Sequence, residues 1–281
     1  MRIAAFEKDG QEGVGLVEDD ALRALPDGFL GGPDPMIDLV TRWERLRGEV
    51  EGALGAPLPL AALRLLAPIR RPGKIWAIGL NYQDHVDESG IDAPEKQVWF
   101  TKAVTALNGP HDPIQIPKAS PYADYEVELV AVVGRRCKHV PRADAASVLF
   151  GYCVGNDVTE RAWQHAGPQW SLGKSFDTHA PIGPWITTAD EVDPHDLDLR
   201  CTVNGETRQS SNTKHLIFDV YDQIEHLSAA MTLEPGDLIF TGTPGGVGAA
   251  MKPMVFLQPG DVVACEVSNL GRIEARMEAE A

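Results

Sequence analysis

Residues 124–134 combine an apolar run with three carboxylates, and this combination constrains the fold strongly. The second half of the segment is almost entirely valine, leucine and alanine, which predicts a buried β-strand. Because side chains alternate between the two faces of a strand, we expect Asp124, Glu126 and Glu128 to share one face. Like charges on a strand that enters a core repel one another and resist desolvation. We therefore expect cationic groups to compensate them.

Composition restricts the partners of this chain. Its 281 residues are enough for one large domain, or for one domain with a smaller companion. With 41 acidic and 25 basic side chains, the formal charge of −16 argues against binding to nucleic acid or to an anionic membrane surface. No apolar run approaches the roughly 20 residues that span a bilayer, and the first residues lack the apolar core of a signal peptide. These features predict a cytoplasmic protein with neither a nucleic-acid nor a membrane partner.

The pattern of apolar residues predicts a division of the chain near residue 70. Residues 1–70 predict a small domain of short strands followed by an amphipathic helix over residues 36–54. From residue 71 to residue 281 strands dominate, and one amphipathic helix is clear over residues 216–231. We therefore predict a strand-rich α+β fold with a small N-terminal domain.

A further carboxylate, Asp157, follows an apolar stretch that ends just before a helical turn. Together with Glu126 and Glu128 it offers three hard oxygen donors without a convergent pair of His or Cys residues. Such a donor set favours Mg²⁺ or Mn²⁺ over zinc or copper. The alternative is that Glu126 and Glu128 lie on a solvated sheet edge and pair with surface lysines.

His85 and Glu88 follow the strand expected over residues 74–78 and would enter a helical turn. Positions three apart share one face of a helix, so Glu88 can orient His85 as a general base that activates a water molecule. The alternative is a solvent-exposed pair that arises by chance. Lys174 likewise offers a point charge to a substrate carboxylate or enolate, or else is an ordinary surface lysine.

Five segments taken together resemble the fumarylacetoacetate hydrolase family. They are G-L-N-Y-x-x-H-x-x-E at residues 79–88, D-Y-E-V-E-L at 124–129, N-D-V-T-E-R-x-x-Q at 156–164, K-S-F-D-x-x-x-P-I-G-P at 174–184 and G-D-L-I-F-T-G-T-P-x-G-V-G at 236–248. The resemblance covers about residues 70–275 in unbroken order and implies a mixed β-sandwich roll with a small N-terminal α+β domain, usually a homodimer. The sequence Gly79-Leu80-Asn81 has no carboxylate where larger members carry a fourth metal ligand. The chain therefore resembles the shorter subgroup of acylpyruvate hydrolases and 2-hydroxyhepta-2,4-diene-1,7-dioate isomerases.

The resemblance also implies roles for individual residues. It implies that Mg²⁺ or Mn²⁺ is held by Glu126, Glu128 and Asp157, and that His85 with Glu88 activates water. The family's positions for binding the substrate and the intermediate fall on Lys174, which is implied to be catalytic, and on Arg161, Gln164, Thr243 and Tyr82.

The implied reaction is metal-assisted hydrolysis of a carbon–carbon bond in a 2,4-dioxo acid such as an acylpyruvate, in the catabolism of aromatic compounds or sugar acids. The same site serves isomerases of 2-hydroxy-dienoates and decarboxylases of 2-oxo acids such as oxaloacetate. A metal-stabilised binding protein without turnover is a further alternative. The motifs do not give the tail of the substrate, and we expect specificity to lie in a lid over residues 85–94 and in the loop over residues 163–170.

Overall fold

The computed structural model describes residues 1–89 and 94–281. Residues 90–93, which belong to the predicted lid over residues 85–94, lie outside the described residues. Within the described ranges, no helix is both long enough and apolar enough to cross a membrane.

Most strands of the described chain join one long mixed sheet of twelve strands. They are β1 (Arg2–Lys8), β2 (Gln11–Glu18), β3 (Ala21–Ala24), β4 (Pro57–Pro59), β5 (Arg64–Leu65), β6 (Ile75–Gly79), β7 (Val98–Thr101), β8 (Leu107–Asn108), β11 (Val127–Val133), β12 (Leu149–Asn156), β14 (Ala180–Thr188) and β17 (Leu238–Phe240). The order is β4-β3-β2-β1-β14-β12-β11-β17-β6-β7, with β5 paired to β1 and β8 paired to β14.

A second sheet packs against the middle of the first. Its strands are β9 (Ile114–Ile116), β15 (Asp198–Val203), β16 (Glu206–Asn212), β18 (Val262–Val267) and β19 (Gly271–Ala279), in the order β16-β15-β18-β19-β9. Strands β11, β12 and β14 contact β15, β18 and β19, and a large hydrophobic core fills the space between them. Two short strands, β10 (Ala123–Asp124) and β13 (Thr159–Glu160), pair separately. This architecture confirms the predicted strand-rich α+β fold with mixed, packed sheets.

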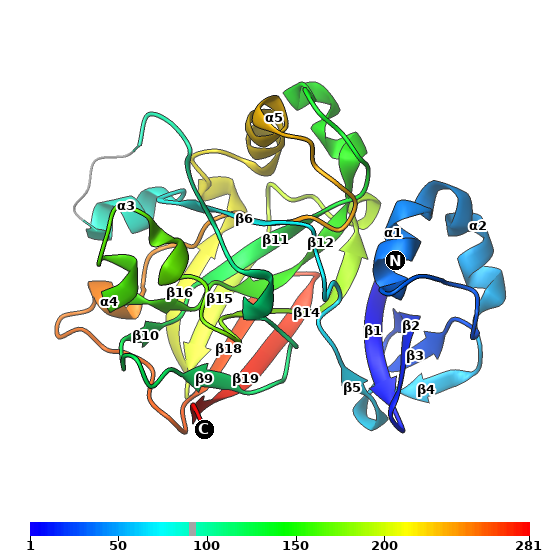
Figure 1. The fold of residues 1–281 in the computed structure, drawn as a ribbon, viewed down its shortest axis with the longest axis horizontal. Coiled ribbons are helices and arrows are strands. Elements are labelled where there is room, and N and C mark those ends of the chain that lie inside the picture. Colours follow the sequence, from blue (N-terminus) through cyan, green and yellow to red (C-terminus); the bar gives the residue numbers. More distant parts are fainter. Residues whose placement is uncertain (90–93) are drawn as a thin grey trace.

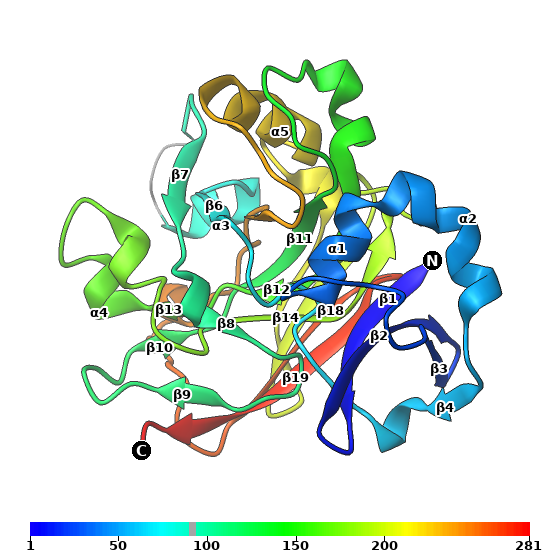
Figure 2. The same cartoon turned by 45° about the vertical axis from the view of Figure 1, so that its right-hand side comes forward.

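The helices are short, and the longest described ones have eleven residues. The α-helices are α1 (Pro35–Thr41), α2 (Trp43–Ala53), α3 (Gln83–Ser89), α4 (Arg161–Gln164) and α5 (Val220–Ala230). Short 3₁₀ helices are η1 (Leu60–Ala62), η2 (Val104–Ala106), η3 (Arg142–Val148), η4 (Trp170–Leu172), η5 (Ala189–Glu191), η6 (Thr213–His215) and η7 (Gly248–Ala250). Figures 1 and 2 both show α1 and α2 beside strands β1–β4 on one side of the molecule and α4 on the opposite side.

Two predicted helices differ from the observed ones because of local capping. The helix predicted over residues 216–231 begins only at Val220, since the Asp219 side chain accepts hydrogen bonds from the first backbone amides in a capping box. The helix predicted over residues 36–54 is two helices, because Arg42, with φ −103° and ψ 10°, ends α1 and precedes α2.

The N-terminal strands extend the long sheet. Strand β1 pairs with β14 through Arg2 opposite Thr187 and Ile3 opposite Ile186. Two of its apolar side chains, Ile3 and Ala5, belong to a core cluster that also contains Phe150 of β12. A domain boundary at residue 70 stays a prediction.

The acidic segment is not one continuous strand, which corrects the sequence prediction. Tyr125 and Glu126 lie between β10 and β11, outside both. The backbone N–H of Glu126 donates to the Asn156 side chain at 2.9 Å, and the N–H of Asp157 donates to the carbonyl of Glu126 at 2.8 Å. Because β11 pairs with β12 with Val127 opposite Asn156, the end of β12 brings Asp157 beside the acidic segment.

Candidate active site and metal centre

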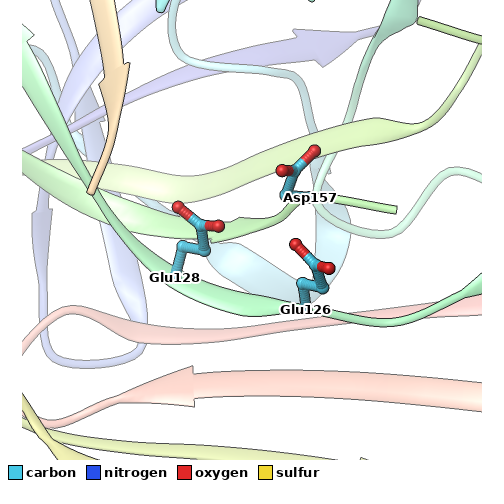
Figure 3. A group of neighbouring side chains, drawn as sticks. All are labelled: Glu126, Glu128 and Asp157. Carbon is cyan, nitrogen blue, oxygen red and sulfur yellow. The ribbon is translucent and has the colours of Figure 1, made fainter. Parts of the chain in front are cut away.

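Three carboxylates converge where the acidic segment meets the end of β12. Glu126, Glu128 and Asp157 are 4%, 1% and 0% exposed, and one oxygen from each lies within 4.8 Å of the others. Figure 3 shows Glu126 and Glu128 on one ribbon and Asp157 on the neighbouring ribbon, with their carboxylates gathered together. This burial excludes the solvated sheet edge that was the alternative from sequence.

Two buried cations compensate much of this charge, as the electrostatic argument predicted. Arg161 donates to Asp124 Oδ2 at 2.9 Å through Nε and contacts Glu126 Oε1 at 2.8 Å. Lys174 Nζ donates to Glu126 Oε2 at 2.6 Å and to Asp157 Oδ2 at 2.7 Å. Burial alone raises the pKa of Glu126, but the charges of Lys174 and Arg161 outweigh it and lower this pKa to about 2. Glu126 is therefore ionised in the folded protein.

Glu128 differs because a backbone amide, rather than a cation, is its hydrogen-bond partner among the described residues. The N–H of Gly242 donates to Glu128 Oε2 at 2.7 Å. This position requires glycine, since Gly242 has a φ of +108° and a Cβ there would lie 2.8 Å from the Asn81 Cβ. Burial, together with the charges of Asp157 and Glu126, raises the pKa of Glu128 well above its usual range. Charge at this carboxylate is thus incompletely compensated by the residues described.

The sequence interpretation missed one cation. Lys102 Nζ donates to Asp157 Oδ1 at 2.5 Å, and its side chain is 0% exposed. Burial lowers the pKa of Lys102, although the charge of Asp157 opposes this shift. With Lys102 included, three cations still face four buried carboxylates, the fourth being Asp124. The donor set therefore fits a divalent cation. It offers three hard oxygen donors that are buried from water, and the carboxylates around it outnumber the cations.

His85 and Glu88 form the predicted pair on α3. His85 Nδ1 lies 2.9 Å from Glu88 Oε1, and the second carboxylate oxygen, Oε2, accepts a hydrogen bond from the Gly246 N–H at 2.7 Å. Because the carboxylate faces Nδ1, it favours the tautomer with a proton there and leaves Nε2 free to accept one. The two side chains are 15% and 23% exposed, so this is not a fully solvated chance pair.

A cavity of about 270 Å³ joins the dyad to the acidic centre. Its polar lining is His85, Glu88, Glu126, Glu128, Arg161, Gln164, His165, Lys174 and Thr243. Its apolar lining includes Ile78, Leu80, Phe100, Trp170, Val247, Ala249 and Ala250. Trp170 lies at the end of the loop over residues 163–170 in which we expected specificity. Glu126, Glu128 and Asp157 are called the triad below. Asp157 is not among the described residues that line the cavity, but it accepts a hydrogen bond from Lys174, which is.

Two of the predicted substrate-binding side chains are oriented by hydrogen bonds. Gln164 Oε1 accepts from Arg161 Nη1 at 3.0 Å. The Thr243 hydroxyl accepts from the Gln209 side chain at 2.8 Å and donates to the Val127 carbonyl at 3.0 Å. Both side chains are therefore held at the wall of the cavity.

Tyr82 and Asp124 are not among the described residues that line the cavity. The Tyr82 side chain is fully buried in the hydrophobic core, and its contact with substrate, implied by the resemblance, stays a prediction. Asp124 binds Arg161 and accepts hydrogen bonds from the N–H groups of Gly248 and Ala249 at 2.8 and 2.9 Å. Asp124 thus connects two parts of the cavity wall and lies outside the group formed by Glu126, Glu128 and Asp157.

Comparison with known proteins gives consistent matches. The family model described as fumarylacetoacetate (FAA) hydrolase C-terminal matches residues 74–278. The chain is 43% identical over 246 residues to the mitochondrial oxaloacetate tautomerase Fahd2a of Rattus norvegicus, covering 86% of this chain and 79% of that protein. It is 43% identical over 276 residues to 2,4-didehydro-3-deoxy-L-rhamnonate hydrolase of Sphingomonas sp. (strain SKA58), covering 96% and 94%. A solved maleylpyruvate hydrolase from Sphingobium sp. SYK-6, in complex with manganese(II) and pyruvate, is 35% identical with a TM-score of 0.84 over 100% of both chains.

Proposed function

Because the chain belongs to the fumarylacetoacetate hydrolase family, and is an enzyme of that family, we propose that it is a metal-dependent hydrolase of 2,4-dioxo acids of the acylpyruvate type. The family membership confirms the resemblance drawn from the five motifs. The observation that carries the proposal is that three buried carboxylates and the pair His85 and Glu88 meet at one cavity.

The metal is proposed to be Mg²⁺ or Mn²⁺, held by Glu126, Glu128 and Asp157. The similar maleylpyruvate hydrolase, solved with manganese, supports this choice. When bound, such a cation supplies Lewis-acid polarisation of the carboxylate and keto oxygens of a 2-oxo acid.

The side chains of the cavity supply the proton transfers and the positioning. His85, oriented by Glu88, takes a proton from water, and the water oxygen adds to the distal carbonyl carbon of the substrate. The bond between that carbon and the central methylene carbon then breaks, and its electron pair passes to the 2-oxo-acid fragment as an enolate. The ammonium of Lys174 stabilises the developing charge. Return of the proton from His85 to carbon gives pyruvate and the second carboxylic acid.

The apolar part of the cavity lining supports an acyl tail. Phe100, Trp170 and Val247 line the cavity together with two alanines, and such surface gains free energy by covering apolar atoms of a ligand. A short alkyl tail, as in acetylpyruvate, matches this surface better than the several hydroxyls of a sugar acid, which would lose water without a polar partner.

The test is an assay with a panel of 2,4-dioxo acids. The ultraviolet absorbance of the enol monitors each reaction, and mass spectrometry identifies the products. Protein stripped of metal and reloaded with Mg²⁺ or Mn²⁺ is expected to convert acetylpyruvate into pyruvate and acetate, and the metal-free protein is expected to be inactive. Failure to release pyruvate from any 2,4-dioxo acid would contradict the hydrolase assignment.

The second candidate is proton transfer without hydrolysis, and the name of the rat relative, oxaloacetate tautomerase, favours it. One base such as His85 can move a proton between carbon and oxygen of an enol without adding water. The same panel separates the reactions: an isomer of unchanged mass indicates isomerisation or tautomerisation, and pyruvate with carbon dioxide from oxaloacetate indicates decarboxylation.

We also propose a homodimer formed through an apolar face around α4. The exposed apolar side chains that support it are Tyr122, Trp163, Leu172, Met254 and Val255. Ring contacts of Tyr122 with Phe256 and of Trp163 with Phe176 connect parts of this face. Exposed apolar surface of this kind marks interaction sites. Light scattering is expected to give twice the mass of one chain, and Leu172→Glu with Met254→Glu is expected to give the monomer.

The predicted cytoplasmic location is kept as a proposal. The rat relative, by contrast, is named as mitochondrial. Fractionation of the source cells, followed by antibody detection, is expected to recover the chain with cytosolic proteins.

A further inference from the structure

Lys102 is a buried cation at the candidate metal centre that belongs to none of the five sequence motifs. It follows β7, and its side chain is completely buried. Its Nζ donates to Asp157 Oδ1 at 2.5 Å and to the Val158 carbonyl at 3.3 Å. A lysine with both contacts and no access to solvent is fixed in position.

Asp157 is therefore held by two lysines, one on each oxygen. Lys174 donates to Oδ2 at 2.7 Å and also to Glu126 at 2.6 Å. The two lysines differ in access, because Lys174 lines the cavity and Lys102 is absent from its described lining. A ligand that enters the cavity can reach Lys174 but not Lys102.

This difference matters when a divalent cation enters the triad. A divalent cation held by the three carboxylates would repel the Lys174 ammonium, which lies between two of them, and Lys174 would then leave Asp157. Without another partner, Asp157 would then meet the cation in an orientation that nothing fixes. Lys102, which is fully buried and on the other oxygen of Asp157, would stay on Oδ1.

We propose that Lys102 is the positioning residue of the metal centre: it holds Asp157 by Oδ1 and leaves Oδ2 to the divalent cation, which frees Lys174 for the substrate. The inference rests on the proposed metal site and adds to it a division of work between two lysines. Lys102 acts through Asp157 and contacts neither substrate nor the reacting atoms.

The test is the affinity of metal-free protein for Mn²⁺, measured by calorimetry and by the electron paramagnetic resonance signal of free Mn²⁺. In Lys102→Met, Lys174 is the one cation left on Asp157 among the described residues. When the metal displaces Lys174, the buried Asp157 carboxylate has no cationic side chain beside it. We expect Mn²⁺ affinity to fall by about 10- to 100-fold, the range for loss of an outer-shell partner. Unchanged or tighter binding would overturn the inference, because it would mean that Lys102 contributes only repulsion.

Lys74→Met is a matched control. Lys74 Nζ pairs with Asp237 Oδ2 at 2.7 Å, and the Asp237 side chain is 1% exposed, but neither residue belongs to the triad. The same chemical change therefore removes a cation from a buried carboxylate elsewhere. We expect it to lower stability and to leave Mn²⁺ affinity within about twofold. An equal loss of affinity in both variants would mean that the effect of Lys102 is general destabilisation.

Two further variants keep the test decisive. Lys102→Gln removes the charge but retains a donor, and it replaces the Met variant if that variant does not fold. Lys102→Arg keeps the charge and is expected to recover about tenfold of the lost affinity; an Arg variant as weak as the uncharged ones would contradict positioning by charge. Wild-type protein that binds no Mn²⁺ would refute the proposed metal function, whereas tight wild-type binding with an unaffected Lys102→Met variant refutes this inference alone.

Discussion

The proposed active site has two parts, the buried carboxylate centre and the pair His85 and Glu88 on helix α3. The protein fixes these two parts in different ways. Glu126, Glu128 and Asp157 are each less than 5% exposed, and each is fixed by a cation or a backbone amide. His85 and Glu88 stand instead on a seven-residue helix, and the described contact from the dyad to the rest of the chain is the Gly246 amide.

This difference predicts in which part of the site metal binding and the stability of the fold change together. A change in the buried centre disturbs ion pairs that have lost their water, so metal binding and folding should change together. A change on α3 disturbs partly exposed groups, so chemistry should change with little effect on the fold. Each variant below either separates these two outcomes or shows that the contrast is wrong.

The largest expected effect belongs to Glu126→Gln in the buried centre. The variant removes one proposed ligand and the charge that Lys174 and Arg161 share. We expect Mn²⁺ affinity to fall by more than about 100-fold, beyond the usual loss for an outer-shell partner, with turnover lost as well. We also expect a loss of about 1–3 kcal/mol in the free energy of unfolding, because buried donors lose a charged acceptor. Calorimetry and urea unfolding measure the two effects.

Glu160→Gln is the matched control for this variant. Glu160 is fully buried and accepts hydrogen bonds from Ser120, Tyr122 and Trp163, but it is outside the triad. It should lose stability while Mn²⁺ affinity stays within about twofold. If both variants bound the metal equally well, the triad assignment would be wrong.

His85→Ala is expected to affect chemistry alone. Loss of a general base lowers turnover by about 10²- to 10⁴-fold, whereas the triad is untouched and Mn²⁺ affinity should be that of the wild type. Steady-state rates with acetylpyruvate, together with calorimetry, measure this separation. His111→Ala, at an exposed histidine outside the cavity, should retain full turnover. Retained hydrolysis in His85→Ala would remove that residue from the mechanism.

Sequence alone was sufficient where the signal is local. Glu126 and Glu128 are two residues apart and His85 and Glu88 are three apart, and each spacing brings two side chains together locally, although Glu126 precedes the first residue of β11. The alternation of apolar residues likewise predicted the strand-rich fold. Asp157 was a candidate because it follows an apolar stretch just before a helical turn, and the structure shows that this stretch, in β12, pairs with β11.

Sequence was insufficient where a distant side chain decides the geometry. Lys102 meets Asp157 across 55 positions and has no motif around it. Counting charges around the acidic segment indicates that a cation is missing but does not say which residue supplies it. The break at Glu126 depends in the same way on a hydrogen bond from its N–H to the Asn156 side chain, which the strand pattern does not encode.

The stability of the buried region beside Lys102 is expected to depend on His179 staying uncharged. Its Nε2 donates to the Gln115 carbonyl at 2.9 Å, and burial, with the charge of Lys102, lowers its pKa from 6.5 to about 4. Because the folded-state pKa lies below the unfolded-state value, the stabilisation is complete above about pH 6.5 and is lost as the pH falls. About 3 kcal/mol should be lost by pH 4. Urea unfolding of His179→Gln should show a weaker decline with acid, and parallel pH profiles would contradict this.

The smallest expected effect belongs to Glu88→Gln on α3. The carboxylate of Glu88 accepts hydrogen bonds on both oxygens, from His85 and from the Gly246 amide, and a glutamine has one acceptor oxygen for these two donors. We expect turnover to fall by about 10- to 100-fold, the rate equivalent of a charged hydrogen bond, with Mn²⁺ affinity unchanged. Asp87→Asn, which removes a carboxylate from the same helix where it meets Gln83, is the matched control and should keep full turnover. If Glu88→Gln instead weakened Mn²⁺ binding, α3 and the buried centre would be one coupled unit, and the contrast between them would fail.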